Sequence, residues 1–141
     1  MPSLLPFAAL MLAPAPASPD WFYLDGTDSV AMYIEASSIV VQGDSRTALT
    51  LSAYAHARAN GAYNIAVTMG FDCGKRLFRT LDFAALDRNG KMLVTEPSPN
   101  RAYRVPGEGS YNDQALRFVC FREGGERVED PLADAEWRLW D

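Results

Sequence analysis

The sequence predicts an α+β domain, in which an antiparallel β-meander is followed by one C-terminal helix that packs on the sheet. Apolar and polar residues alternate with a period of two through most of residues 29–96, as they do in strands that bury one face. Asn-Gly pairs at residues 60–61 and 89–90 separate alternating runs, and this pair favours hairpin turns. After residue 110 the apolar spacing becomes helical. The length of 141 residues fits one domain.

The first strands are delimited by turn sequences. An Asp25-Gly26 turn ends a short initial strand. Residues 29–37 then alternate, with an apolar face that consists of Val30, Met32 and Ile34. Tyr33 is therefore expected on the opposite, polar face. Residues 46–58 alternate again, and their polar face carries Thr50, Ser52, Tyr54, His56 and Arg58.

The most regular strand is predicted over residues 63–73. One of its faces carries Tyr63, Ile65, Val67, Met69, Phe71 and Cys73. Cys73 ends this row, so its thiol is expected to point toward the core. The next run, residues 75–86, alternates less cleanly, which indicates a bulge near Gly74 or a partly covered second face. Residues 91–96 return as the last strand.

A helix is expected to begin at Ser110, after a proline-rich loop. The Ser110 hydroxyl can accept a hydrogen bond from a free backbone N–H, and Asp113 completes a sequence similar to a capping box. Leu116, Val119 and Cys120 recur on one side at helical spacing. Gly124-Gly125 is expected to end the helix.

The only two cysteines, Cys73 and Cys120, are interpreted as a disulfide. The sequence has no Cys-x-x-Cys redox pair. A zinc site needs about four ligands, and the single histidine, His56, is expected on the other face of the sheet. The same separation argues against a Cys–His nucleophilic pair. A Cys73–Cys120 bond would tie the helix to the sheet, and closing such a loop contributes about 3–4 kcal/mol.

Residues 1–17 are typical of a secretory signal peptide. The apolar run from Leu4 to Leu12 is too short to span a bilayer, which takes about 20 residues. Ala15-Pro16-Ala17 fits a small-x-small cleavage site. We therefore expect an exported protein, periplasmic or secreted, that begins near Ser18. No cysteine stands directly after the leader, so no lipid anchor is expected. No later segment is typical of a transmembrane helix, so no membrane span is expected.

Charge and motifs narrow the class of function. The formal net charge is −5, which gives no attraction to a phosphate backbone, so no nucleic-acid partner is expected. Neither Gly-x-Ser-x-Gly nor His-Glu-x-x-His occurs. The sequence from Asp87 to Gly90 is better explained by a hairpin than by a calcium loop. We therefore expect no enzyme, no cofactor and no metal site.

The candidate binding face consists of Tyr33, Tyr54, His56 and Arg58, which would form one patch if their strands were neighbours. Tyr and Arg are enriched at protein interfaces. The alternative is a solvated outer face, which antiparallel sheets commonly have.

Residues 124–141 are predicted to form an acidic tail that carries Trp137 and Trp140. Asp130 can cap a short helix in which Pro131 occupies the first position. Two exposed tryptophans would leave a large apolar area in water. We therefore expect the tail to dock, either on the sheet of its own chain or on a second copy.

Several of these motifs resemble the bacterial surface-adhesin protein E family. The resemblance rests on Phe71-Asp72-Cys73 with the basic and aromatic residues after it, on the following hairpin, on the "VPGEGS" helix start and on the "FVC" at the second cysteine. The stretch that begins at Trp21 also looks like the first hairpin of the family. The resemblance implies a bent antiparallel sheet of about six strands, with the helix tied by the disulfide across its concave face, and it allows a homodimer.

The resemblance implies a binding function for a single adhesin E-like domain, expected over residues 18–123. A member of the family is an outer-membrane lipoprotein that binds host proteins, so the expected partner is a host or cell-envelope protein. The alternative is a soluble periplasmic protein that binds a small ligand or assists an enzyme. That alternative requires a cavity of at least about 300 Å³ between sheet and helix.

Overall fold

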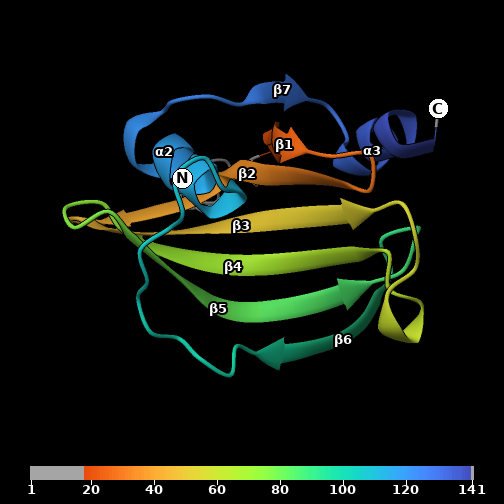
Figure 1. Ribbon diagram of the computed structural model, residues 1–141, viewed down its shortest axis with the longest axis horizontal. Coiled ribbons are helices and arrows are strands. Elements are labelled where there is room, and N and C mark those ends of the chain that lie inside the picture. The colour runs from red at the N-terminus through yellow and green to blue at the C-terminus, as the bar shows by residue number, and fades with distance from the viewer. Residues whose placement is uncertain (1–17, 141) are drawn as a thin grey trace, which may run out of the picture.

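The computed structural model describes residues 18–140, which form a seven-stranded antiparallel sheet and two α-helices (Figure 1). The predicted signal peptide lies outside the described residues. The strands are β1 (Trp21–Gly26), β2 (Val30–Gln42), β3 (Ser45–Tyr54), β4 (Asn64–Asp72), β5 (Leu77–Leu86), β6 (Met92–Pro97) and β7 (Glu126–Val128).

The sheet confirms the predicted meander and adds one strand to it. The strand order is β6-β5-β4-β3-β2-β1-β7, so the first six strands pair with their neighbours in the chain. The three-residue β7 comes from the C-terminal segment and pairs with the outer edge of β1. The first strand is therefore enclosed between two others, while β6 and β7 form the two edges.

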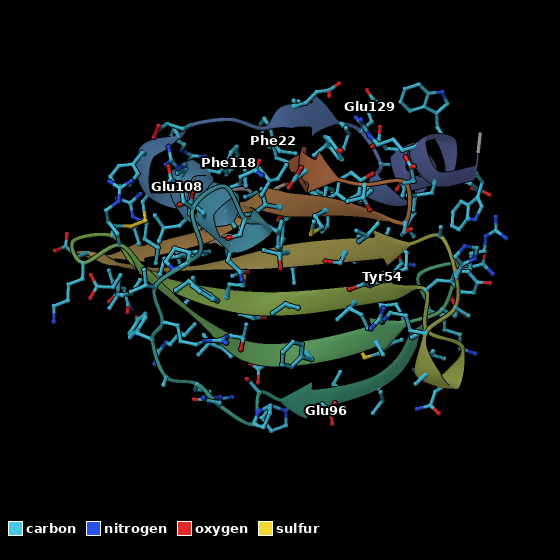
Figure 2. The ribbon with its side chains drawn as sticks, viewed as in Figure 1. Phe22, Tyr54, Glu96, Glu108, Phe118 and Glu129 are labelled. Carbon is cyan, nitrogen blue, oxygen red and sulfur yellow. A yellow bond between two sulfur atoms is a disulfide. The ribbon has the colours of Figure 1, made fainter. Side chains whose placement is uncertain are left out.

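Helix α2 (Tyr111–Phe121) forms as its capping residues predict. The Asp113 backbone N–H donates to the Ser110 hydroxyl at 3.2 Å, and the Asp113 carboxylate accepts from the Gly109 N–H at 2.9 Å. The helix ends after Phe121, where the C-cap residue Arg122 has a left-handed backbone with φ of 56°, so it stops two residues before the expected Gly124-Gly125 pair. Phe118 of α2 lies against Phe22 of β1, with ring centroids 4.9 Å apart (Figure 2).

The core beneath α2 joins this helix to one face of strands β1–β5. Its buried members are Leu24, Ile34, Ala48, Met69, Phe71, Phe78, Ala115, Leu116, Phe118 and Val119. The predicted apolar rows of β2 and β4 thus supply half of the buried sheet residues of this core, namely Ile34, Met69 and Phe71.

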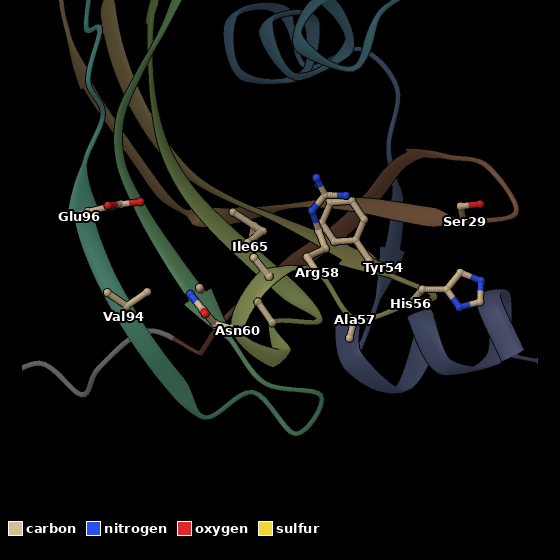
Figure 3. Close-up of a pocket in the computed structure, with 12 residues that line it drawn as sticks. Ser29, Tyr54, His56, Ala57, Arg58, Asn60, Ile65, Val94 and Glu96 are labelled. Atoms are coloured by element: carbon tan, nitrogen blue, oxygen red, sulfur yellow. The ribbon is translucent and has the colours of Figure 1, made fainter.

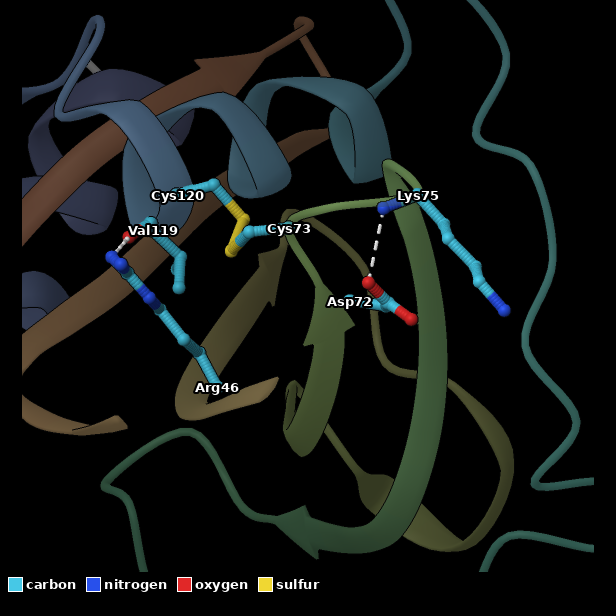
Figure 4. Close-up of a disulfide and its surroundings, with 6 residues drawn as sticks. All are labelled: Arg46, Asp72, Cys73, Lys75, Val119 and Cys120. Carbon is cyan, nitrogen blue, oxygen red and sulfur yellow. Dashed lines mark hydrogen bonds between the residues drawn. A yellow bond between two sulfur atoms is a disulfide. The ribbon is translucent and has the colours of Figure 1, made fainter. Parts of the chain in front are cut away.

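The Cys73–Cys120 disulfide is confirmed, and it joins the end of β4 to the last turn of α2 (Figure 4). Beside it, the Arg46 guanidinium donates to the Val119 carbonyl at 2.8 Å. A carbonyl in the last turn of a helix has no partner within the helix, so Arg46 satisfies this group and also places a positive charge at the negative end of the helix.

Helix α3 (Pro131–Trp140) packs on the face of the sheet opposite to α2. The Asp130 carboxylate accepts from the Leu132 N–H at 3.0 Å, so Asp130 caps the helix as expected. The second core, beneath α3, has the buried members Ala31, Tyr33, Leu51, Ala53 and Ala135. Both helices contact β1–β3, one on each face, so these three strands are covered on both faces. Figure 1 shows α2 and α3 near opposite ends of these strands.

The expectation that Tyr33 lies on an exposed polar face is wrong. Its side chain is 0% exposed and belongs to the core beneath α3. Alternation places Tyr33 and Ile34 on opposite faces of β2, as predicted, but α3 brings a second apolar layer onto the face that the pattern assigned to solvent. Its hydroxyl donates to the Asp134 carboxylate of α3 at 2.6 Å, so the one polar atom of this buried side chain is satisfied.

The irregularity in the fourth and fifth strands lies between Thr68 and Met69, away from Gly74. Thr68 pairs with Asp82 and Met69 pairs with Thr80, so Leu81 is an extra residue on β5. An extra residue moves the following side chains to the other face of the strand. This explains why the apolar pattern of residues 75–86 does not alternate cleanly.

No helix within residues 18–140 has the length and apolar character that crossing a membrane requires.

Candidate functional site

Three of the four residues predicted to form a binding face line one hollow of about 490 Å³ (Figure 3). Tyr54 ends β3, and His56 and Arg58 follow it in the segment that connects β3 to β4. The fourth residue, Tyr33, lies beneath α3 on the opposite face and takes no part. The structure therefore brings together three of the residues that the polar-face pattern grouped, Tyr54, His56 and Arg58, but not Tyr33 of β2.

The segment after β3 is held in shape by backbone hydrogen bonds. The Tyr54 N–H donates to the Tyr63 carbonyl at 2.8 Å, and the Arg58 N–H donates to the Ala62 carbonyl at 2.7 Å. Between these pairs the chain turns at Asn60-Gly61, where both residues have positive φ, of 61° and 76°. The predicted turn is thus confirmed, although the strand before it ends at Tyr54 rather than at Arg58.

Arg58 stacks on the ring of Tyr54, with its guanidinium carbon 4.6 Å from the ring centroid. Stacking holds the guanidinium plane against the ring and leaves its edge N–H groups available for a ligand. Within residues 18–140, Arg58 forms no ion pair. The pair therefore presents a positively charged hydrogen-bond donor beside an aromatic side chain.

The floor of the hollow is apolar and comes from three neighbouring strands. Ile65 of β4 pairs with Ala85 of β5, which pairs with Val94 of β6, so their side chains share one face. Glu96 lies two residues further along β6, on the same face as Val94. In Figure 3 Val94 and Glu96 lie across the hollow from Tyr54 and His56. The hollow thus has an apolar floor with a basic and an acidic side chain on its rim.

The predicted tail lies against the same end of the sheet. The Trp140 indole N–H donates to the Ala55 carbonyl at 3.0 Å, and Arg88 lies 4.2 Å above the Trp140 ring. Ala55 immediately precedes His56, so α3 contacts the segment that forms one wall of the hollow. Trp137 is 62% exposed and lines a second hollow, of about 530 Å³, near Tyr23 and Asp28.

One hollow beside α2 is smaller than a typical ligand site. The hollow that Gln114 and Arg117 of α2 border, with Leu24 and the Glu123–Gly125 turn, measures about 180 Å³. A small-ligand site under this helix requires at least about 300 Å³. The hollow at Tyr54 contains no residue of α2.

Two tyrosines with displaced pKa values lie away from the hollow. Burial, with the hydrogen bond to the Asp134 carboxylate, raises the pKa of Tyr33 far above its ordinary value of 10.0. Burial likewise raises the pKa of Tyr111 in α2. Both phenols therefore remain neutral throughout the physiological pH range.

Among the described residues, no three His, Cys, Asp or Glu side chains gather closely enough to hold a metal ion.

The family model described as surface-adhesin protein E matches residues 21–121. This range covers β1 through α2 and both cysteines. No curated protein and no solved structure matches the chain.

Proposed function

Because the chain belongs to the surface-adhesin protein E family, we propose that it is an exported, non-enzymatic binding module that contacts a host or cell-envelope protein. The disulfide supports export, since such bonds form and persist in oxidising compartments. The apolar leader and its cleavage-site pattern support the same conclusion. We place the mature protein in the periplasm or outside the cell.

The contact site of this module is the hollow formed by Tyr54, His56 and Arg58. The convergence of these three side chains over an apolar floor is the observation that carries the proposal. An aromatic ring with a stacked arginine beside a concave apolar surface is the composition favoured at the energetic centres of protein interfaces. An acidic chain has no charge attraction to nucleic acid, so the partner is a protein.

The test is affinity capture with the tagged mature protein, from cell-envelope and host extracts, in parallel with its Tyr54→Ala and Arg58→Ala variants. We expect a specific partner whose binding weakens at least about fivefold in each variant, as for residues at the centre of an interface. Arg127→Ala is the matched control, because Arg127 is an exposed arginine of β7, at the other edge of the sheet from β6.

Equal capture of the same partner by the native protein and by both variants would show that the hollow is not the contact site.

A further inference from the structure

Strand β6 is an edge of the sheet with an apolar and exposed surface. All six of its residues are exposed, including Met92 at 58%, Leu93 at 43% and Val94 at 48%. Figure 1 shows no described element beyond β6. An edge strand presents backbone N–H and C=O groups that pair with no neighbour on that side. This edge is therefore able to accept a further strand.

Hollows border β6 on both faces of the sheet. The hollow at Tyr54 includes Val94 on one face of the sheet. On the other face, a different hollow of about 410 Å³ includes Thr95 and Pro97. Small side chains on β4 and β5, among them Ala66 and Ala84, help to form this 410 Å³ hollow. Successive side chains of a strand point to opposite faces. A strand added to β6 would therefore direct alternate side chains toward the two hollows.

The charge at this edge specifies what the added strand carries. Glu96 borders both hollows, is exposed, and forms no ion pair with any residue from 18 to 140. The nearby Asp82 differs, because its carboxylate already pairs with Arg101 at 2.9 Å. Opposite charges directly across two paired strands stabilise the pairing. A basic side chain opposite Glu96 is thus the complementary choice.

The flanks of β6 restrict where such a strand can pair. Lys91 precedes the strand, Leu93 is unpaired at a register shift, and Pro97 has no backbone N–H. These features are among those that limit uncontrolled pairing at sheet edges. They leave the segment Val94–Glu96 as the regular part of the edge, so the register of an added strand is defined.

We propose that β6 binds an extended segment of the partner protein as an additional antiparallel strand, with an apolar side chain opposite Val94 and a basic side chain opposite Glu96. The antiparallel direction follows from the rest of the sheet, in which every pair is antiparallel. Backbone hydrogen bonds supply affinity in this mode of recognition, and the alternate side chains supply specificity. This inference rests on the proposed function, because one of the two hollows is the proposed contact site.

The test uses a synthetic peptide, acetyl-Thr-Lys-Thr-Val-Thr-amide, titrated into isotope-labelled protein and followed by NMR. We expect shifts at the backbone amides of Val94–Glu96, and slower hydrogen exchange at those among them whose N–H points to the free edge. The same peptide with N-methyl groups on alternate residues, which removes edge hydrogen bonds, should not bind. Replacing its lysine by glutamate should weaken binding at least about threefold.

A charge reversal in the protein supplies the matched control. In Glu96→Lys the preference between the lysine and glutamate peptides should invert, whereas Glu129→Lys, which follows β7 at the other edge of the sheet and forms no ion pair within residues 18–140, should leave it unchanged. Both glutamates are exposed, so neither variant should disturb the fold. Equal binding of the N-methylated peptide, or an unchanged preference in Glu96→Lys, would overturn the inference.

The outcome is separable from that of the proposed function. If partner capture depends on Arg58 but the peptide does not affect β6, the hollow remains the contact site and strand addition is wrong. If the peptide binds β6 while capture is independent of both Tyr54 and Arg58, the proposed contact site is wrong and strand addition stands. Protection of Val94–Glu96 that rises with protein concentration, without peptide, would mean that a second copy occupies the edge, and would also overturn the inference.

Discussion

Tyr33 illustrates how a residue's environment depends on an element almost 100 positions away. Its neighbours in the sequence assign it to a polar face, and α3 then covers that face. The phenol hydroxyl donates to Asp134, whose carboxylate also accepts from Arg138 at 2.6 Å. Arg138 lies 3.6 Å from the centroid of the Tyr23 ring. These contacts of Asp134 and Arg138 thus attach α3 to β2 and β1.

Removing the Tyr33 hydroxyl should destabilise the protein. Tyr33→Phe leaves the ring in the core but removes one of the two donors to the Asp134 carboxylate, the other being Arg138, so we expect the free energy of unfolding to fall by about 1–3 kcal/mol. Urea denaturation followed by circular dichroism measures the change. Tyr63→Phe is the control, because the Tyr63 hydroxyl makes no hydrogen bond to residues 18–140 in the structure. A loss in Tyr33→Phe no larger than in the control would contradict this role.

The raised pKa values of Tyr33 and Tyr111 predict lower stability at alkaline pH. In the unfolded chain both phenols ionise near pH 10, whereas the folded protein keeps them neutral to higher pH. Their contribution is fully present below about pH 10 and is lost as the pH rises toward the folded-state pKa values. Urea midpoints measured from pH 8 to pH 11 should therefore fall above pH 10, and less steeply in Tyr33→Phe. An identical slope in the variant would contradict the displaced pKa of Tyr33.

At the scale of elements, the disulfide stabilises the contact of α2 with the sheet. Its cysteines are 47 positions apart, and a bond that closes such a loop contributes about 3–4 kcal/mol by restricting the unfolded chain. We expect the double variant Cys73→Ser and Cys120→Ser to lose free energy of unfolding of this size in urea. Native protein treated with a reductant should shift by a similar amount. Unchanged midpoints in both experiments would show that the bond contributes nothing.

Helix α3 should contribute to stability through the core that it covers. Deleting residues 131–141 exposes Tyr33 and Leu51, and we expect a loss of about 3–6 kcal/mol, because burial of each large apolar side chain contributes about 1.5–3 kcal/mol. Thermal denaturation measures the loss. Trp137→Ala is the control, since Trp137 is mostly exposed and its replacement should change little.

Sedimentation of the same deletion variant addresses whether α3 also contacts a second copy. A contact confined to its own sheet leaves the sedimentation mass unchanged, whereas a contact with a second copy lowers it. An unaltered melting temperature would mean that the C-terminal segment adds no stability.

Elements with local signals could be predicted, and elements that depend on distant contacts could not. Helix α2 begins at Ser110 because its own first turn contains the cap. The turn at Asn60-Gly61 likewise follows from two residues that tolerate positive φ. Strand β7 has only three residues and exists because β1 offers a partner, so nothing in its own sequence marks it. The alternation of residues along β2 likewise could not predict that α3 covers the face that carries Tyr33.

At the scale of the whole molecule, the sheet has two different halves. Strands β1–β3 lie between two helices, whereas β4 and β5 contact α2 only at one end and, together with β6, carry hollows on both faces. The candidate site lies where the covered half meets the open one. The sequence placed Tyr54, His56 and Arg58 together, because they belong to one strand and its continuation. Glu96 and Val94 were not anticipated, because only the register of β4, β5 and β6 brings them to the same hollow.

Export of the whole molecule is expected to include removal of the leader. The Ala15-Pro16-Ala17 pattern predicts that the mature chain starts near Ser18. N-terminal sequencing of protein recovered from the periplasm or the medium checks this position. Protein that starts at Pro2 and remains in the cytosol would show the localisation to be wrong.

The pairing of β1 with β7 has a consequence for the order in which the molecule is completed. Residues 107 positions apart meet at this edge, where Arg127 pairs with Asp20 at 2.8 Å. A chain is synthesised from its N-terminus, so the meander and α2 emerge before β7 and α3 exist. During that interval the outer edge of β1 and the face of β2 that carries Ala31 and Tyr33 are uncovered. The last 16 described residues, 125–140, therefore complete the fold. A chain that is truncated before them keeps an unpaired edge on β1 and is prone to aggregate with other chains.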